Sequence, residues 1–185
     1  MEITTIPQLI TFLSEKGDHD MKVLEIMKSV TIPQEEFEKY YSWNQKRYTR
    51  NVLFRDDKLE LILVCMEKGQ ASPIHDFNSQ EAWIHPVVGR LREERYKINP
   101  GDDIKLEQIS SVLLGPDEYS YMNQVGIHRF TNDYESRSVS LNVYAKPVRE
   151  WRVYEENTSN AVVQKTWTDK YYDLTPSLGI ASNPL

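Results

Sequence analysis

The chain has 185 residues, the size of one domain that can enclose a real core. Hydrophobic residues make up 39% and charged residues 27%, and the formal net charge is −6 without a block of lysines or arginines. This composition argues against a nucleic-acid partner, which needs a concentrated basic face, and no apolar run of about 18 residues predicts a membrane span.

Cysteine usage and the N-terminus point to a cellular compartment. Cys65 is the one cysteine, so an internal disulfide and a multi-cysteine zinc site are excluded. The first residues carry no positive region and are broken by Pro7, which is not typical of a secretory signal. We therefore expect a soluble, cytoplasmic monomer.

The first 45 residues predict a helical leader. Apolar residues recur at helical spacing over residues 6–13, and Gly17 is a typical stop signal. A second apolar series occupies residues 23–30. Thr31 and Pro33 then mark the start of a third helix.

After Arg47 short stretches rich in Val, Ile, Leu and Tyr alternate with turn signals. Strands at this spacing, without helical patterns between them, predict an antiparallel barrel or sandwich over about residues 50–168, followed by a tail from about 175. The ten predicted strands are 51–54, 59–66, 82–88, 90–96, 109–113, 118–122, 126–130, 139–144, 151–154 and 162–167. Turns are predicted at 55–57, 100–102, 115–117 and 132–133.

Four histidines are the candidates for a metal site: His19, His75, His85 and His128. Metal sites in β-barrels often take two ligands two residues apart on one strand, because those side chains share a face, and a third from a distant strand. Residues 69–77 (GQASPIHDF) look like the first half, with Phe77 in place of the second ligand, and His128 looks like the distant one. On spacing alone, an ordinary hydrogen-bonded histidine remains the commoner interpretation.

Several segments resemble the cysteine dioxygenase family of the cupin superfamily, in the family's order and roughly its spacing. The resemblance implies a mostly β fold, a cupin (double-stranded β-helix or jelly-roll) barrel with N-terminal helices, as a single domain over residues 1–185. The segments are RYTRN (47–51), LILVC (61–65), SPIHD (72–76), VVGRLRE (87–93), VGIHRFTN (125–132) and SVSLNVYAKP (138–147).

The resemblance also implies a reaction and a cofactor. Cysteine dioxygenases oxidise the thiol of cysteine to a sulfinic acid with O2 at Fe(II), which three neutral histidines hold. His75 and His128 match the first and third ligands, whereas the second falls at Phe77, whose ring offers no lone pair. Implied partners are O2 and cysteine or a similar small thiol or amino acid.

Three further residues match pocket positions of the family. Arg50 matches the arginine that grips the substrate carboxylate, a task suited to a planar guanidinium. Tyr48 matches a tyrosine that lines this pocket. Tyr144 matches the tyrosine beside the iron, a possible proton donor. It ends a Ser140, Asn142, Tyr144 series in which the family has a histidine at the middle position.

The remaining candidates are expected to lie elsewhere. Strand alternation turns Glu81, Asp76 and His85 away from the barrel interior, so a replacement ligand is not expected, although Glu81 would be the first suspect. His19 is expected in a solvated turn, and Cys65 as a small buried apolar residue.

Two functions therefore stay open. One is a thiol dioxygenase with a weakened iron site. The other is a catalytically degenerate cupin without functional iron that binds an amino-acid-like ligand or a protein partner.

Overall fold

The structure, a computed structural model, describes residues 2–16, 23–76, 81–99, 105–123, 126–156 and 160–175. Gly17, His19, Phe77, the turn at 100–102 and the tail beyond 175 lie outside the described residues. In the described part, helices α1 (Ile6–Lys16), α2 (Val23–Met27) and α3 (Glu35–Glu38) precede the strands. These are β1 (Thr49–Arg55), β2 (Glu60–Met66), β3 (Ile74–His75), β4 (Glu81–Val88), β5 (Leu91–Asn99), β6 (Lys105–Leu114), β7 (Ser120–Asn123), β8 (Ile127–Thr131), β9 (Ser138–Tyr144), β10 (Glu150–Tyr154), β11 (Ala161–Lys165) and β12 (Lys170–Tyr171).

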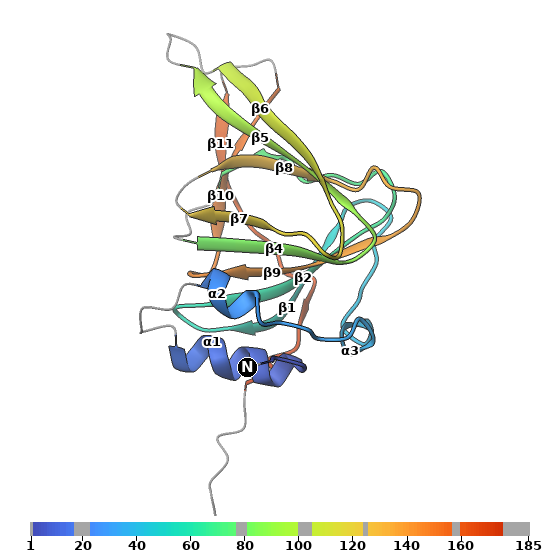
Figure 1. Cartoon of the computed structure of the whole chain (residues 1–185). Helices are drawn as coiled ribbons and strands as arrows, with labels where there is room; N and C mark the ends of the chain where they lie inside the picture. Colours follow the sequence, from blue (N-terminus) through green and yellow to red (C-terminus); the bar gives the residue numbers. More distant parts are fainter. Residues whose placement is uncertain are drawn as a thin grey trace, which may run out of the picture.

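The strands form two six-stranded sheets, in the orders β12-β1-β2-β9-β4-β7 and β11-β10-β3-β8-β5-β6. Figure 1 shows the sheets facing each other and splaying apart at one end. The mostly β cupin fold is confirmed, but the barrel is not closed, because the sheets keep separate edge strands and share no ladder of hydrogen bonds in the described part. The strand pairing is antiparallel apart from β1 with β12, which run parallel.

A glycine turn carries the chain from one sheet to the other between β4 and β5. Gly89 has φ +69°, and a Cβ placed on it would lie 2.6 Å from Ser138 Oγ. A side chain at this position would be strained and would clash with β9, so glycine is required there.

The first sheet is buried on both faces, which explains the unbroken apolar sequence of β2. Leu61, Leu63 and Cys65 belong to the hydrophobic cluster that includes the helical leader, called the leader cluster below. Ile62 and Val64 belong to the hydrophobic cluster between the sheets. Alternation along the strand therefore separates a face covered by helices from a face that lines an interior. Cys65 is 1% exposed and forms no disulfide, as predicted.

Helix α1 covers the outer face of this sheet, as Figure 1 shows. Ile6, Leu9, Ile10 and Leu13 are buried against it, at the spacing that predicted the helix. Burying a side chain of this size stabilises the fold by about 1.5–3 kcal/mol. The leader thus closes one face and leaves the inward face to form the site.

Two strands were not predicted, β3 and β12. Each has two residues, and each exists through its partners: β3 pairs with β8 and β10, and β12 pairs with β1. β3 carries the buried His75, whereas β12 is exposed and follows the segment that contacts Arg50.

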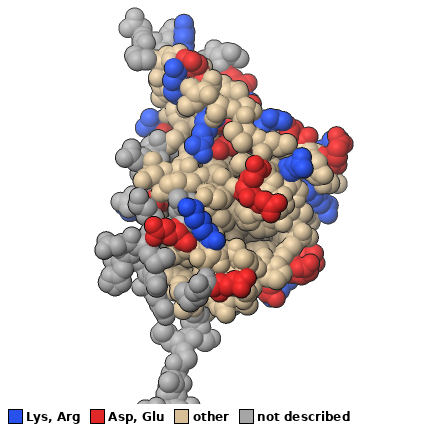
Figure 2. Space-filling model, in the orientation of Figure 1, with Lys and Arg blue, Asp and Glu red and all other residues tan. Residues whose placement is uncertain are grey.

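Charge is mixed over the surface in view. Figure 2 shows Lys and Arg interspersed with Asp and Glu on this face. No helix in the described ranges is long and apolar enough to cross a membrane.

Candidate functional site

Neighbouring strands bring the two predicted metal-ligand histidines together. His75 on β3 is the direct cross-strand partner of His128 on β8. Their ring centroids lie 4.8 Å apart, and the residues are 6% and 2% exposed. At this separation one cation could contact both rings through bonds of roughly 2.1 Å.

The hydrogen bond of the His75 ring assigns its lone pair to Nε2. His75 Nδ1 lies 2.9 Å from the Pro73 carbonyl oxygen, which can only accept, so Nδ1 carries the proton. His128 Nδ1 lies 3.3 Å from Glu93 Oε1. Burial, and then the charges of His128 and Arg50, hold the pKa of His75 well below its usual range, so this ring is neutral at neutral pH. A neutral ring fixed in this way is typical of a metal ligand.

Glu93 is a site residue that the sequence analysis missed. It is buried on β5 and accepts a hydrogen bond from Ser120 Oγ at 2.8 Å, and Arg95 Nη2 lies 3.1 Å away. Burial raises the pKa of Glu93, but the hydrogen bonds and charges of His128 and Arg95 outweigh it and lower the pKa overall. Glu93 therefore stays ionised and orients His128. The signal in the sequence was its inward phase in β5, which alternates buried and half-buried residues at its start.

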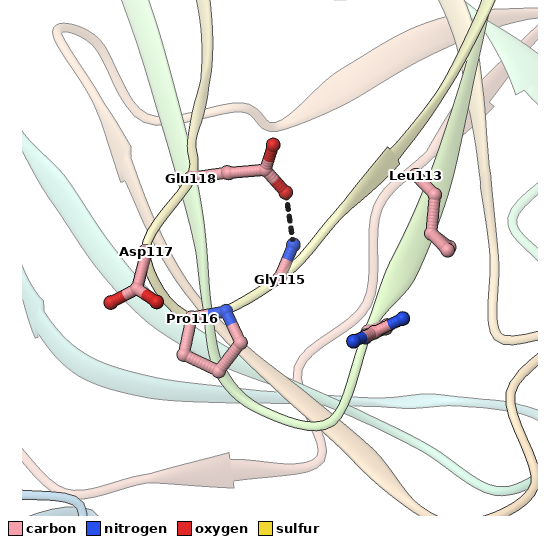
Figure 3. A pocket seen from close by; sticks show the side chains of 6 residues that line it. Leu113, Gly115, Pro116, Asp117 and Glu118 are labelled. Atoms are coloured by element: carbon pink, nitrogen blue, oxygen red, sulfur yellow. Dashed lines mark hydrogen bonds between the residues drawn. The ribbon is translucent and has the colours of Figure 1, made fainter.

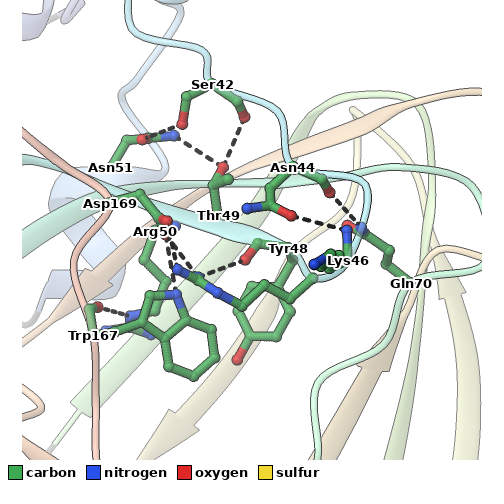
Figure 4. A network of polar contacts seen from close by, with 11 residues as sticks. Ser42, Asn44, Lys46, Tyr48, Thr49, Arg50, Asn51, Gln70, Trp167 and Asp169 are labelled. Carbon is green, nitrogen blue, oxygen red and sulfur yellow. Dashed lines mark hydrogen bonds and ion pairs between the residues drawn. The ribbon is translucent and has the colours of Figure 1, made fainter.

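Arg50 is a buried cation on the inward face of β1, 3% exposed. Its Nε donates to the Trp167 carbonyl at 3.1 Å, and its backbone N–H donates to Asp169 Oδ2 at 2.9 Å (Figure 4). Its Nη2 lies 3.8 Å from Glu60 Oε2 and makes no hydrogen bond to any described residue. A buried charged donor is thus left available to a ligand.

Glu60, also missed, is the carboxylate that offsets the charge of Arg50. It is 0% exposed at the start of β2 and accepts hydrogen bonds from Arg55 Nε at 2.8 Å, from Arg55 Nη2 and from the Val148 N–H at 3.0 Å. Its signal was a single acidic residue at the head of an apolar strand. Arg50 and Arg55 therefore share one buried carboxylate, which leaves a net positive charge beside the predicted site residues.

Tyr144 ends a hydrogen-bonded series on β9. Ser140 Oγ donates to Asn142 Oδ1 at 2.7 Å, and Asn142 Nδ2 donates to Tyr144 Oη at 3.1 Å. Burial raises the pKa of Tyr144 although Arg50 and Asn142 oppose it, so the phenol is protonated at neutral pH. It can therefore donate a hydrogen bond or a proton, while Asn142 orients it without titrating.

Two tryptophans that the sequence analysis did not single out pack against the predicted site residues. The Trp151 ring lies 4.5 Å from the His75 ring and 5.6 Å from the Trp167 ring, and Arg50 Cζ lies 5.5 Å from its centroid. Tyr48 packs on Trp167 at 5.0 Å, and Figure 4 shows both beside Arg50. The structure therefore brings together all five predicted residues, Tyr48, Arg50, His75, His128 and Tyr144, around these rings.

The alternative ligands lie outside this cluster. Glu81 accepts a hydrogen bond from Tyr121 Oη and shares its strand face with Trp83, which packs in the leader cluster. Asp76 accepts from Tyr154 Oη at 2.9 Å, and His85 Nδ1 lies 2.9 Å from the Glu118 carbonyl. Within the described ranges, no three His, Cys, Asp or Glu side chains are placed to hold one ion.

A hollow on the surface lies apart from the predicted site residues. It is formed around the β6–β7 turn, where Glu118 accepts a hydrogen bond from the Gly115 N–H at 2.9 Å (Figure 3). Its lining consists of Arg90, Leu113, Gly115, Pro116, Asp117 and Glu118. None of the five predicted residues borders it.

Two facing antiparallel sheets with a histidine pair, an arginine and a tyrosine buried between them define a cupin protein with a buried polar cluster. A family model described as cysteine dioxygenase type I matches residues 2–157, and the chain belongs to this family. A cysteine dioxygenase type 1 from Danio rerio is 26% identical, with 95% of this chain and 92% of the relative covered. The Homo sapiens enzyme of that name is 26% identical, covering 84% and 80%.

Likeness to solved structures is distant. One is an uncharacterized conserved protein with a double-stranded beta-helix domain from Klebsiella pneumoniae. It aligns with a TM-score of 0.46 and 13% identity, covering 64% of this chain and 94% of that one.

Proposed function

We propose that this chain acts on cysteine or a similar small thiol as a thiol dioxygenase, forming a sulfinate with O2 at a ferrous site. The observation that carries the proposal is the unused Nη2 donor of Arg50, buried beside Trp151, whose ring also contacts His75 of the histidine pair. Membership of the cysteine dioxygenase family supports the same reaction class.

Arg50 is the residue proposed to bind the ligand carboxylate. The shared carboxylate of Glu60 leaves excess positive charge, and the Trp167 carbonyl fixes the guanidinium through Nε. A ligand carboxylate would accept a hydrogen bond from Nη2. Because both groups are charged, this bond would be stronger than one between neutral groups. Tyr48 would line the same pocket through its packing on Trp167.

The donor set fits iron in part. His75 and His128 would hold the ion through Nε2, whereas Phe77 offers no donor, so two of the family's three ligands are present. A ferrous ion would supply the activation of O2. Tyr144, protonated and oriented by Asn142, would donate a hydrogen bond or a proton to the ligand.

The second candidate is a carboxylate-binding cupin without functional iron. The specific observations that favour it are Phe77 at a ligand position and Asn142 at the histidine position of the tyrosine series. Losing even residues that only support metal ligands typically costs roughly 10–100-fold in affinity, so loss of a ligand itself weakens metal binding further.

Anaerobic calorimetry with L-cysteine tests the ligand site that both candidates share. Arg50→Ala should abolish binding, and Arg50→Lys should restore it only in part, because a lysine keeps the charge beside Glu60 but not the fork of donors. Arg92→Ala, at an exposed ion pair with Asp133, is the matched control and should bind as the wild type does. Equal binding by all four proteins would refute the role of Arg50.

Aerobic incubation with cysteine, together with an iron measurement, then separates the candidates. Cysteine sulfinate formed in proportion to iron content supports the dioxygenase. Cysteine binding without iron or sulfinate supports the binding protein.

A further inference from the structure

Two buried hydrogen-bond donors beside the histidine pair lack an acceptor among the described residues. They are Arg50 Nη2 and Trp151 Nε1. Leaving a buried donor unpaired is unfavourable, and the great majority of such groups in folded proteins find a partner. Two orphaned donors on residues in mutual contact indicate a site built for an acceptor that the protein itself does not supply.

Trp151 lies beside both Arg50, the proposed carboxylate-binding residue, and His75, a proposed metal ligand. Its ring contacts the Arg50 guanidinium at 5.5 Å and the His75 ring at 4.5 Å, and the residue is 4% exposed on β10. Trp167 fixes it from a third direction, edge to face at 5.6 Å. The indole is therefore held beside both Arg50 and His75, where a ligand bound between these two residues would contact it.

We propose that Trp151 is a specificity-determining residue whose Nε1–H donates a second hydrogen bond, beside Arg50, to the carboxylate of the ligand. A carboxylate has two oxygens and can accept from both donors at once. The inference rests on the proposed function, because it takes the same residues as the ligand site. It adds a second carboxylate donor, on β10, to the Arg50 donor on β1.

Trp83 provides a comparison within the chain. Its Nε1 is also buried without an acceptor among the described residues, but its ring packs in the leader cluster and stacks on His85 and Tyr119. Trp83 therefore shares the orphaned donor and lacks the contact with Arg50 and His75. The same substitution at both positions separates an effect on the ligand from an effect of removing a buried N–H.

The test is anaerobic calorimetry of the full chain with L-cysteine. Trp151→Phe keeps an aromatic ring and removes the donor together with part of the indole's volume, so the dissociation constant should rise about ten-fold, the value of one hydrogen bond to a charged group. Trp83→Phe should leave it unchanged. Both variants lose the same side-chain volume from a buried position, so both should lower the thermal midpoint, whereas only Trp151→Phe should weaken ligand binding.

A second titration with cysteamine, the same thiol without its carboxylate, checks which group the indole recognises. Wild type and Trp151→Phe should bind cysteamine equally. An unchanged dissociation constant for cysteine in Trp151→Phe, or an equal loss for cysteamine, would overturn the inference while cysteine binding still supports the proposed function. No uptake of cysteine by the wild type would overturn both.

Discussion

Glu60 should be the most sensitive single position for stability at this site. It is fully buried, and it accepts hydrogen bonds from Arg55 and the Val148 N–H while facing Arg50 at 3.8 Å. Glu60→Gln keeps the shape and one acceptor but leaves two arginines, 3% and 13% exposed, without their counter-charge. Breaking a buried pair in this way costs about 3–5 kcal/mol. In a chain of this length the thermal midpoint should fall by about 6–20 °C.

Differential scanning calorimetry would measure this fall. The matched control is Glu135→Gln, which removes an exposed carboxylate 2.6 Å from Lys68, with side chains 82% and 59% exposed. Solvent and salt screen an exposed pair of this kind, so its midpoint should move far less than that of Glu60→Gln. If the two variants shift equally, burial of the Arg50–Glu60–Arg55 group contributes nothing, and the electrostatic account of Arg50 fails.

Three further changes have defined outcomes. Phe77→His supplies the missing donor and should raise the iron content of the purified protein. The unmodified chain could instead carry near-stoichiometric iron and form cysteine sulfinate. That result would require a third ligand in addition to His75 and His128. Asn142→Leu removes a hydrogen-bond partner from Ser140 Oγ and from Tyr144 Oη. It should lower the free energy of unfolding, measured in urea, by about 1–3 kcal/mol. An unchanged free energy would contradict the hydrogen-bonded Ser140–Asn142–Tyr144 series. Burial lowers the pKa of His85, so the unfolded chain binds more protons than the folded one and stability should fall as the pH drops below about 6.5. His85→Gln should lose less stability over this pH range. If wild type and His85→Gln lose stability equally as the pH falls, the role of His85 is refuted.

The longer strands were predictable because their signals are local. Runs of β-branched and aromatic residues between turns predicted β1, β2 and β4–β11 within a few residues. The short strands had no such signal. His75 is in a strand because β8 and β10 flank it, and Lys170 and Tyr171 are in one because β1 lies beside them, more than a hundred residues earlier in the chain. Pairing of this kind depends on the assembled fold.

The site divides in a similar way. His75, His128, Arg50 and Tyr144 were assigned through motifs, which preserve residue type and order. Glu60 and Glu93 could not be assigned with equal ease, because a carboxylate in a sequence is usually solvated and only the assembled sheets bury these two. The prediction that Glu81 and His85 face outward needed nothing beyond strand alternation, and the hydrogen bonds of both residues agree with it.

The position of Arg50 depends on residues outside the motif that predicted it. Its Nε is held by the Trp167 carbonyl and its backbone by Asp169, both in the segment that leads into β12, and Asp169 also binds Arg47 through both carboxylate oxygens and Trp167 Nε1. This segment lies beyond residues 2–157, the part matched by the family. The motif therefore supplies the guanidinium, whereas the C-terminal segment sets which of its donors remain for a ligand. A change in ligand preference would then need no change in the motif, because altering the wall formed by Trp151 and Trp167 would suffice.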